Sequence, residues 1–347
     1  MKIFRGFHHP EVAPACALTI GNFDGVHRGH QAMLALLNSE AQHRGVQSCV
    51  LTFEPHPRDY FAGVHKRPDL APARIGTLRD KLSELARCGV QQTIVLPFNE
   101  KLARQAPQAF IDDVVVGGLG ARYLLVGDDF RFGAQRAGDY AMLDTAGRER
   151  GFEVARMNSY EVHGLRVSSS AVRDALGAGD MEEATRLLGR PYAISGHVVH
   201  GRKLGRSLGR SAASGPHQDG FRTLNLRFAH WKPAASGIFA VLVHGLDAEP
   251  LPGVANLGVR PSLDPSDVNG GRVLLETHCL QWPAHLGAEG AYGKIVRVEL
   301  LHKLHDELKY DSLGALTTGI AKDCDDARAY FASSHAETRR QTTRDRI

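Results

Sequence analysis

The first half of the chain alternates short apolar runs with longer stretches in which apolar residues recur at helical spacing. Short continuous apolar runs are typical of strands buried on both faces, and the longer stretches are typical of helices that cover a sheet. This alternation predicts an α/β domain built on a doubly wound parallel sheet. The expected strands are 17–20, 49–53, 92–96 and 123–126, and the expected helices are 31–42, 78–88, 107–117 and 180–188.

The pattern changes after Pro191. Short β-rich runs follow, and turn signals such as Pro252-Gly253 and 269–271 separate them. This pattern predicts an antiparallel barrel or sandwich, with a terminal helix over 313–331 and a polar tail without regular structure from Ser333. We therefore expect two domains that join near residue 190. The expected strands of the second domain are 192–200, 223–228, 237–243, 273–279 and 294–301.

Composition narrows the class of protein. The 347 residues are 43% hydrophobic and 23% charged, which excludes low-complexity, collagen-like and disordered chains. The net charge of +4 comes without a long Lys/Arg block, so we expect no nucleic-acid partner. No apolar run has the roughly 18 residues of a membrane span, and the N-terminus lacks the apolar core of a signal peptide. The five cysteines are scattered, which argues against disulfides. We expect a cytoplasmic protein without a membrane partner.

Residues 21–30 lead from the end of a predicted strand through a glycine-containing loop into a predicted helix. A parallel sheet binds phosphates at this place, because unpaired N–H groups and the helix dipole favour anions. His27 and His30 lie on one face of the first helical turn, where imidazoles suit the charge that develops during phosphoryl-group transfer. The alternatives are surface histidines or metal ligands, but no third ligand with suitable spacing supports zinc.

A second polar motif precedes another predicted helix. Ser168, Ser169 and Ser170 offer hydroxyls that cap a helix or donate to a phosphate, and Arg173 is suited to bidentate phosphate binding. A serine run by itself is more often a simple cap. Together with the histidine motif, it favours a nucleotide site.

The second half carries candidate residues of its own. Thr223 and Asn225 stand two apart in a predicted strand, so they share a face on which their oxygens could hold Mg²⁺ against nucleotide phosphates. Glu276 interrupts an apolar strand, as a solvent-facing residue or as a base for an attacking hydroxyl. The glycine-rich basic segment 201–210 could cover a polyphosphate or be an ordinary solvated loop. It is not a P-loop, because its surroundings are β-rich.

Four motifs carry a resemblance to a known family. GNFDGVHRGH at 21–30 and VSSSAVR at 167–173 resemble the signatures of the nucleotidyltransferase superfamily. With TFEPHP at 52–57 and VGDDFRFG at 126–133, in this order, they resemble the prokaryotic bifunctional riboflavin kinase/FAD synthetase family. Residues 186–332 are similar to the riboflavin kinase module of the same family.

The resemblance implies a nucleotidyltransferase domain with FMN adenylyltransferase (FAD synthetase) activity over 1–187. It also implies a riboflavin kinase domain, a six-stranded antiparallel barrel, over 188–332 and leaves 333–347 as a disordered tail. The first domain would make FAD from FMN and ATP, and the second would make FMN from riboflavin and ATP with Mg²⁺. The implied partners are the flavins and ATP, and a homo-oligomer is left open.

The resemblance also implies roles for individual residues. His27, His30 and Glu276 would be catalytic, and Thr223 and Asn225 would hold the metal. The implied ATP-binding residues are Gly21, Asn22, Phe23, Asp24, Ser168 and Arg173 in the first domain, and Gly201, Lys203 and Gly205 in the second. The implied flavin-binding residues are Asp129, Phe130, Phe132 and Arg260, although Phe130 and Phe132 fit plain core packing equally well.

The chain departs from the family pattern at one place. About eleven extra residues, 210–220, precede Thr223, and Arg222 stands where the family has proline. The insertion could loop out or could impair the kinase site. The alternatives to a two-activity enzyme are therefore a monofunctional FAD synthetase with an impaired barrel and, from another class, a non-catalytic flavin- or RNA-binding protein.

Overall fold

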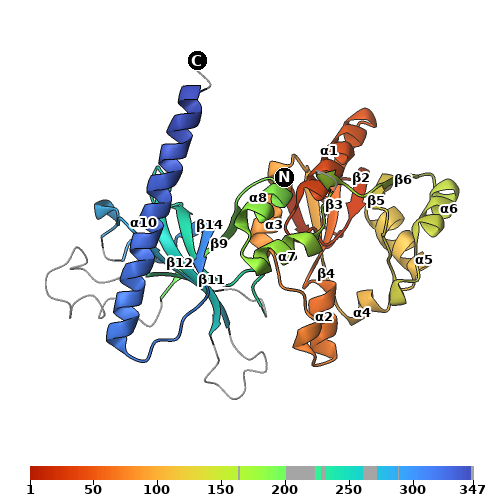
Figure 1. Ribbon diagram of the computed structural model, residues 1–347. Coiled ribbons are helices and arrows are strands. Elements are labelled where there is room, and N and C mark those ends of the chain that lie inside the picture. The colour runs from red at the N-terminus through yellow and green to blue at the C-terminus, as the bar shows by residue number, and fades with distance from the viewer. Residues whose placement is uncertain (163–164, 201–222, 228–231, 261–271, 288, 345–347) are drawn as a thin grey trace. The chain divides into compact units, whose positions relative to one another are not determined.

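The computed structural model describes all residues except 163–164, 201–222, 228–231, 261–271, 288 and 345–347 (Figure 1). The chain divides into two compact units, the first formed by 1–72 and 78–171 and the second by 73–77 and 172–347. The division at 171–172 comes earlier than the join near residue 190 that the sequence predicted. The reason is that helix α8 (Met181–Leu188) packs against two strands of the second unit, β9 (Tyr192–Val199) and β14 (Ile295–His305).

The first unit contains a six-stranded parallel sheet in the order β1-β4-β3-β2-β5-β6. The four strands with continuous apolar runs were predicted, and the parallel arrangement is confirmed. The two that were not predicted, β1 and β6, are edge strands in which Phe4 is the one buried residue, so they lack a strong hydrophobic signal. The strands are β1 (Lys2–Arg5), β2 (Cys16–Ile20), β3 (Gln47–Glu54), β4 (Gln92–Pro97), β5 (Ala121–Gly127) and β6 (Glu153–Met157).

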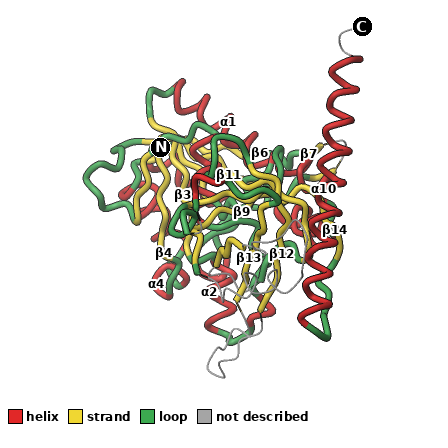
Figure 2. The backbone as a smooth tube through the Cα atoms, turned by 90° about the vertical axis from the view of Figure 1, so that its left-hand side faces the viewer, coloured by secondary structure: helices red, strands yellow, loops and turns green. Residues whose placement is uncertain are grey.

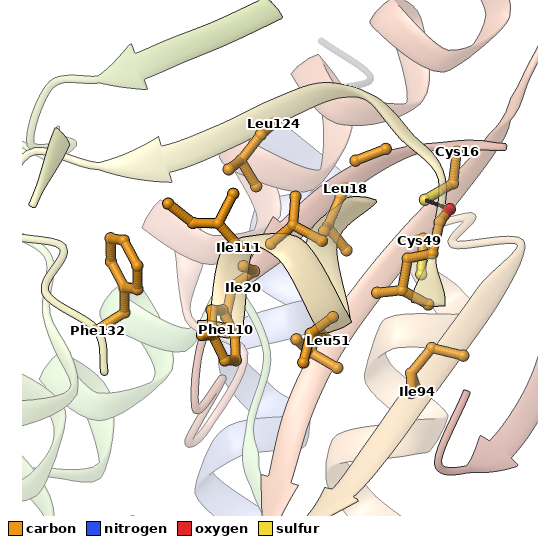
Figure 3. Close-up of a cluster of buried hydrophobic side chains, with 14 of the residues drawn as sticks. Cys16, Leu18, Ile20, Cys49, Leu51, Ile94, Phe110, Ile111, Leu124 and Phe132 are labelled. Carbon is orange, nitrogen blue, oxygen red and sulfur yellow. Dashed lines mark hydrogen bonds between the residues drawn. The ribbon is translucent and has the colours of Figure 1, made fainter. Parts of the chain in front are cut away.

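Helices cover both faces of this sheet, because successive strand residues point to opposite sides. On one face Leu18 and Leu51 pack with Phe110 and Ile111 (Figure 3). On the other face Ala17 and Val50 belong to the cluster that α1 and α3 contribute to. The helices are α1 (Arg28–His43), α2 (Pro57–Val64), α3 (Leu78–Arg87), α4 (Glu100–Ala103), α5 (Pro107–Phe110) and α6 (Tyr140–Arg150), with short 3₁₀ turns η1 (Pro68–Leu70) and η3 (Ala134–Arg136).

The segment predicted as an α-helix over 107–117 has a different helical form in the structure. The structure has the single α-helical turn α5 followed by a π-helix, η2 (Ile111–Gly118). Gly117 and Gly118 close this segment, and glycine weakens the preference for regular α-helix. A small antiparallel hairpin, β7 (Glu161–Val162) and β8 (Leu165–Arg166), precedes α7 (Ser169–Ala178).

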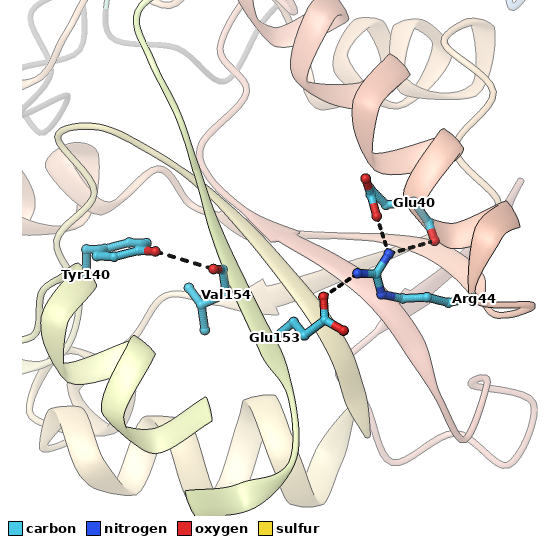
Figure 4. Close-up of polar contacts among 5 residues, drawn as sticks. All are labelled: Glu40, Arg44, Tyr140, Glu153 and Val154. Atoms are coloured by element: carbon cyan, nitrogen blue, oxygen red, sulfur yellow. Dashed lines mark hydrogen bonds and ion pairs between the residues drawn. The ribbon is translucent and has the colours of Figure 1, made fainter. Parts of the chain in front are cut away.

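Polar contacts connect the edge strand β6 to the end of α1 and to the start of α6 (Figure 4). Arg44, which follows α1, pairs with Glu40 of that helix and with Glu153 of β6. The hydroxyl of Tyr140, at the start of α6, donates to the carbonyl of Val154, 3.3 Å away. These contacts add to the partly buried apolar packing of β6 against the core.

The strand order places a switch point beside β2. From β2 the chain adds β3 and β4 on one side, and it later adds β5 and β6 on the other. Because β2 and β5 are parallel neighbours, the loops that follow them meet at one edge of the sheet. Open α/β sheets bind their ligands at such a place.

Gly120, just before β5, is required by a close approach as well as by its backbone conformation. Its φ is +53°, and a Cβ there would lie 2.1 Å from the Pro14 carbonyl oxygen. We expect Gly120→Ala to destabilise the first unit by about 2–4 kcal/mol, the sum of left-handed strain and overpacking. Gly45→Ala is the matched control, because its φ is +64° but nothing lies within 4 Å of its added Cβ. Thermal unfolding of both variants checks this, and equal losses would contradict it.

The second unit is a closed six-stranded barrel in the order β10-β13-β12-β11-β14-β9. Strand β9 pairs with both β10 and β14, so the sheet closes into a barrel, and the sandwich alternative is excluded. Helix α10 packs on the outer face of β11, β12 and β14 (Figure 2). Cys324 and Ala327 of this helix belong to one buried cluster with Ile238 and Val254. The remaining elements are β10 (Thr223–Arg227), β11 (Gly237–His244), β12 (Leu251–Arg260), β13 (Arg272–Cys279), η4 (Ala284–Leu286) and α10 (Leu313–Arg344).

The predicted fold class is confirmed, but two expectations about the second half were wrong. Pro252-Gly253 is not a turn, because both residues lie inside β12. A Cβ on Gly253 would lie 2.7 Å from the His278 carbonyl oxygen, so this glycine allows a close approach of strands rather than a reversal. The chain also keeps regular structure after Ser333, because α10 continues to Arg344. No helix in the described part of the chain has the length and apolarity to cross a membrane.

Candidate active sites

The loop between β2 and α1 has a strained backbone. Phe23 and Val26 have φ values of +48° and +40°, which non-glycine residues seldom adopt, and Gly25 has a φ of +86°. The side chains of Phe23 and Val26 are buried among residues of α1, β3 and β5, and this packing holds the loop in place. Strain of this kind collects where a backbone must meet a ligand.

His27 and His30 lie together at the start of α1, as their spacing predicted. His27 is the N-cap, and its Nδ1 accepts a hydrogen bond from the backbone N–H of His30 at 3.3 Å. The two rings stack with centroids 3.7 Å apart and planes 21° apart. A neutral His27 that accepts at Nδ1 carries its proton on Nε2, where it is a donor to an anion.

The surroundings of His30 keep its ring neutral. Burial is the main reason that its pKa lies well below the usual value, and the electrostatic interactions with His27 and Lys81 lower the pKa further. Lys81 is itself only 4% exposed on α3, and its Nζ donates to the Thr52 hydroxyl at 3.3 Å. In the described part of the chain, Nδ1 of His30 is buried and has no hydrogen-bond partner.

The serine motif meets the histidine loop. The hydroxyl of Ser169 donates to the backbone carbonyl of Asp24 at 3.0 Å. A Cβ on Gly29 would lie 3.4 Å from the carbonyl oxygen of Val167, an ordinary contact distance, so the two segments lie side by side. Ser168 caps α7, since its Oγ accepts from the backbone N–H of Ala171 at 3.2 Å. The predicted pairing of these two motifs in one place therefore agrees with the structure.

Two further motifs join the same edge of the sheet. Thr52 donates its hydroxyl to the carbonyl of Asn22 at 3.3 Å, which ties the segment 52–57 to the histidine loop. Asp128, in the loop after β5, accepts from the Ser159 hydroxyl at 2.6 Å and from Arg166 at 3.4 Å. The Ser159 hydrogen bond is the main reason that the pKa of Asp128 is lowered. All four motifs thus gather at the switch point.

The predicted residues of this site differ in how the structure places them. Asn22, Asp24 and Ser168 lie where the motifs meet. Arg173 belongs to the second unit, and its Nε donates to the carbonyl of Ala73 at 2.7 Å. The remaining loop residues are Gly21, where a Cβ would lie 3.1 Å from the Phe23 ring, and Phe23 itself, which is buried.

The predicted flavin loop after β5 contains two aromatic rings that stack. Phe132 is 7% exposed and packs on Phe110 in the core, and Phe130 stacks on Phe132 with centroids 5.7 Å apart. Asp129 is exposed beside Arg166, 3.7 Å away. Phe132 is therefore a core residue in this structure, and contact of these three residues with a flavin stays a prediction.

The barrel brings its own predicted residues together. Asn225 of β10 lies directly opposite Glu276 of β13, and Thr223 lies opposite His278 on the same pair of strands. The Asn225 side chain is 4% exposed, and its amide donates to the Thr223 carbonyl at 3.3 Å. Opposed residues hold their Cβ atoms about 4.5–5.5 Å apart. Two oxygen-bearing side chains and a carboxylate therefore share one face of two strands.

The comparisons with known proteins agree with this two-site arrangement. The family model described as FAD synthetase matches residues 9–171, and the one described as riboflavin kinase matches residues 188–331. The chain is 43% identical to the bifunctional riboflavin kinase/FMN adenylyltransferase of Escherichia coli strain K12, over 95% of this chain and 98% of that protein. The chain belongs to this bifunctional family.

Other relatives carry the same description. The protein of Haemophilus influenzae is 40% identical over 96% of this chain and its own full length, and that of Pseudomonas fluorescens is 41% identical over 96% of this chain and 99% of its own. A solved structure from Streptococcus pneumoniae, described as a macrolide-efflux protein, has a TM-score of 0.71 and 25% identity over 94% of this chain and 99% of that one. The predicted family, and with it the prediction of a transferase with two activities, is confirmed.

Several residues assigned to the riboflavin kinase half lie outside the described residues. These are Gly201, Lys203 and Gly205 of the glycine-rich segment, the insertion 210–220 and Arg222. Arg260 is the last residue of β12, and its side chain is not described. Their roles stay predictions.

Two polar residues near these family sites escaped the sequence-based reasoning. Lys81 lies in an ordinary helical pattern, and only the fold shows that its ammonium group is buried near His30. Asn256 of β12 lies opposite Glu276 on the side away from Asn225. The one feature of the sequence that could have pointed to Asn256 is its polar amide within the apolar run 254–259.

The low pKa of His30 predicts how this ring titrates. In the folded protein, we expect its imidazole to stay neutral as the pH falls from about 8 to 6, whereas in the unfolded chain it titrates near about 6.5. NMR of protein labelled with ¹⁵N in histidine checks this, with the His30 signal assigned by its loss in His30→Gln. The same sample in urea is the control. A folded-state midpoint at or above that of the unfolded chain would contradict the burial and charge that surround His30.

Proposed function

We propose that the first unit transfers the AMP group of ATP to FMN, and that the barrel transfers the γ-phosphoryl group of ATP to riboflavin. The observation that carries this proposal is the hydrogen-bonded meeting of four phosphate- and flavin-associated motifs at the switch point of the parallel sheet. We assign AMP transfer to residues 1–187 and phosphoryl transfer to residues 188–332, and the two family models fall within these ranges.

In AMP transfer, a phosphate oxygen of FMN forms a bond to the α-phosphorus of ATP. The bond from this phosphorus to the bridging oxygen breaks, and pyrophosphate leaves with that electron pair. No side-chain nucleophile is needed, so the protein acts by positioning and by charge stabilisation. In this proposal, the Nε2–H of His27, the His30 ring and the N–H groups at the start of α1 donate to the phosphate oxygens as charge develops, and the stacking of the two rings at the N-terminus of α1 supports it.

In phosphoryl transfer, the terminal ribityl hydroxyl of riboflavin attacks the γ-phosphorus of ATP and ADP leaves. Glu276 accepts the hydroxyl proton. The Thr223 hydroxyl and the Asn225 amide oxygen fit Mg²⁺ because this ion takes a few protein oxygens together with nucleotide phosphates. When bound, Mg²⁺ offsets phosphate charge. Both reactions consume ATP, so we place the enzyme in the cytoplasm, with flavins and ATP as its partners.

Product analysis tests this proposal. The purified chain is incubated with ATP and MgCl₂ and with either riboflavin or FMN, and the flavins are separated by chromatography. We expect riboflavin to give FMN and then FAD, and FMN to give FAD. FAD formed only from FMN would show a kinase impaired by the insertion 210–220. Flavin binding without any product would contradict the enzyme assignment in favour of a binding protein.

A further inference from the structure

A row of polar residues crosses three neighbouring strands of the barrel. Asn225 of β10, Glu276 of β13 and Asn256 of β12 lie directly opposite one another in register. On one side of them, Leu226, Leu275 and Leu257 form a row that is apolar and buried. Side chains alternate between the inside and the outside of a barrel, so the three polar residues share the face opposite to these leucines. The row therefore extends the proposed kinase site by one strand.

Asn256 has an atom that the protein leaves without a partner. Its Oδ1 is buried, and the described part of the chain supplies no hydrogen-bond donor to it. An unsatisfied buried acceptor costs about 1–3 kcal/mol, and such atoms in native proteins call for an explanation. A donor on a bound substrate would satisfy this oxygen.

The neighbouring charges indicate the chemistry of that substrate. Glu276 lies opposite Asn256 on β13, and Gly258, two residues along β12, is covered by the carboxylate of Glu307. A Cβ on Gly258 would lie 2.2 Å from Oε1 of Glu307, so the missing side chain admits this carboxylate. Two carboxylates beside Asn256 disfavour a polyphosphate here. Acceptor oxygens in a row instead suit a neutral chain of hydroxyl groups.

We propose that Oδ1 of Asn256 accepts a hydrogen bond from a ribityl hydroxyl adjacent to the one that is phosphorylated, and so positions the polyol beside Glu276. This inference rests on the proposed kinase function. It makes Asn256 a specificity residue for the ribityl chain, distinct from the residues that face ATP and Mg²⁺.

The test compares a flavin with a ribityl chain and one without. Asn256→Leu keeps the shape of the side chain and removes the acceptor. We expect it to raise the KM for riboflavin about tenfold, because one buried hydrogen bond to the substrate is lost. The inhibition constant of lumiflavin, which has a methyl group in place of the ribityl chain, should stay unchanged, as should the KM for ATP. Asn256→Asp keeps an oxygen at Oδ1, so its KM for riboflavin should lie close to that of the unaltered chain. This variant replaces the leucine variant in the test if the latter does not fold.

Thr277→Val is the matched control. Thr277 also has a buried oxygen without a partner in the described structure, but it lies one residue away from Glu276 and so on the opposite face of β13. We expect this variant to leave the riboflavin KM unchanged. An unchanged riboflavin KM in Asn256→Leu, or an equal weakening of riboflavin and lumiflavin binding, would overturn this inference and leave the proposed function standing. Failure of the unaltered chain to form FMN would overturn the proposed function and the inference with it.

Discussion

Replacing His30 with alanine is expected to abolish FAD formation while FMN formation from riboflavin continues. His30 stacks on His27 at the start of α1, and its ring is held neutral mainly by burial, with a further contribution from the buried ammonium group of Lys81. Removal of one such donor from a charge-stabilising site typically lowers the rate by about 10²–10³-fold. The measurement is the rate of FAD formation from supplied FMN and ATP.

His43→Ala is the control for this variant. His43 lies in the last turn of the same helix and is exposed, so its loss should change neither rate. If His30→Ala also stopped FMN formation in a folded protein, the assignment of the two reactions to separate residues would be wrong. An FAD rate equal to that of the unaltered chain would remove His30 from the site.

Replacing Glu276 with glutamine is expected to have the opposite effect. The amide keeps the size of the side chain opposite Asn225 and Asn256 but cannot accept the proton of the attacking hydroxyl. FMN formation should fall by about 10²–10⁴-fold, the usual contribution of a general base. AMP transfer to supplied FMN should continue at the unaltered rate.

Glu249→Gln provides the control, because Glu249 is an exposed residue between β11 and β12. We expect it to leave both activities unchanged. Retained FMN formation in Glu276→Gln would indicate that Glu276 is a solvent-facing residue without a part in catalysis, which is the alternative that the sequence left open.

The sequence predicted those parts of the molecule that depend on local pattern. Strands β3 and β5 are buried on both faces, so their apolar runs stood out, whereas the less buried edge strands β1 and β6 did not. Likewise, His27 and His30 could be paired from their spacing alone, because one helical turn brings them together.

Features that depend on contacts between distant segments could not be predicted in the same way. The place of Asn256 beside Glu276 follows from the register of β12 and β13, which local periodicity does not set. The burial of Lys81 depends on how α3 packs near Thr52. Pro252-Gly253 was misjudged because a glycine that permits close strand approach resembles a turn glycine in a single sequence.

The central claim is that one chain carries two separate sites that act in succession. The most direct measurement mixes the two variants, His30→Ala and Glu276→Gln, with riboflavin, ATP and MgCl₂ and follows FAD. The account predicts that neither variant alone converts riboflavin to FAD and that the mixture does, because one protein supplies FMN and the other consumes it. FAD formed by either variant alone as fast as by the mixture, or no FAD from a mixture whose members each complete their own half-reaction, would contradict it.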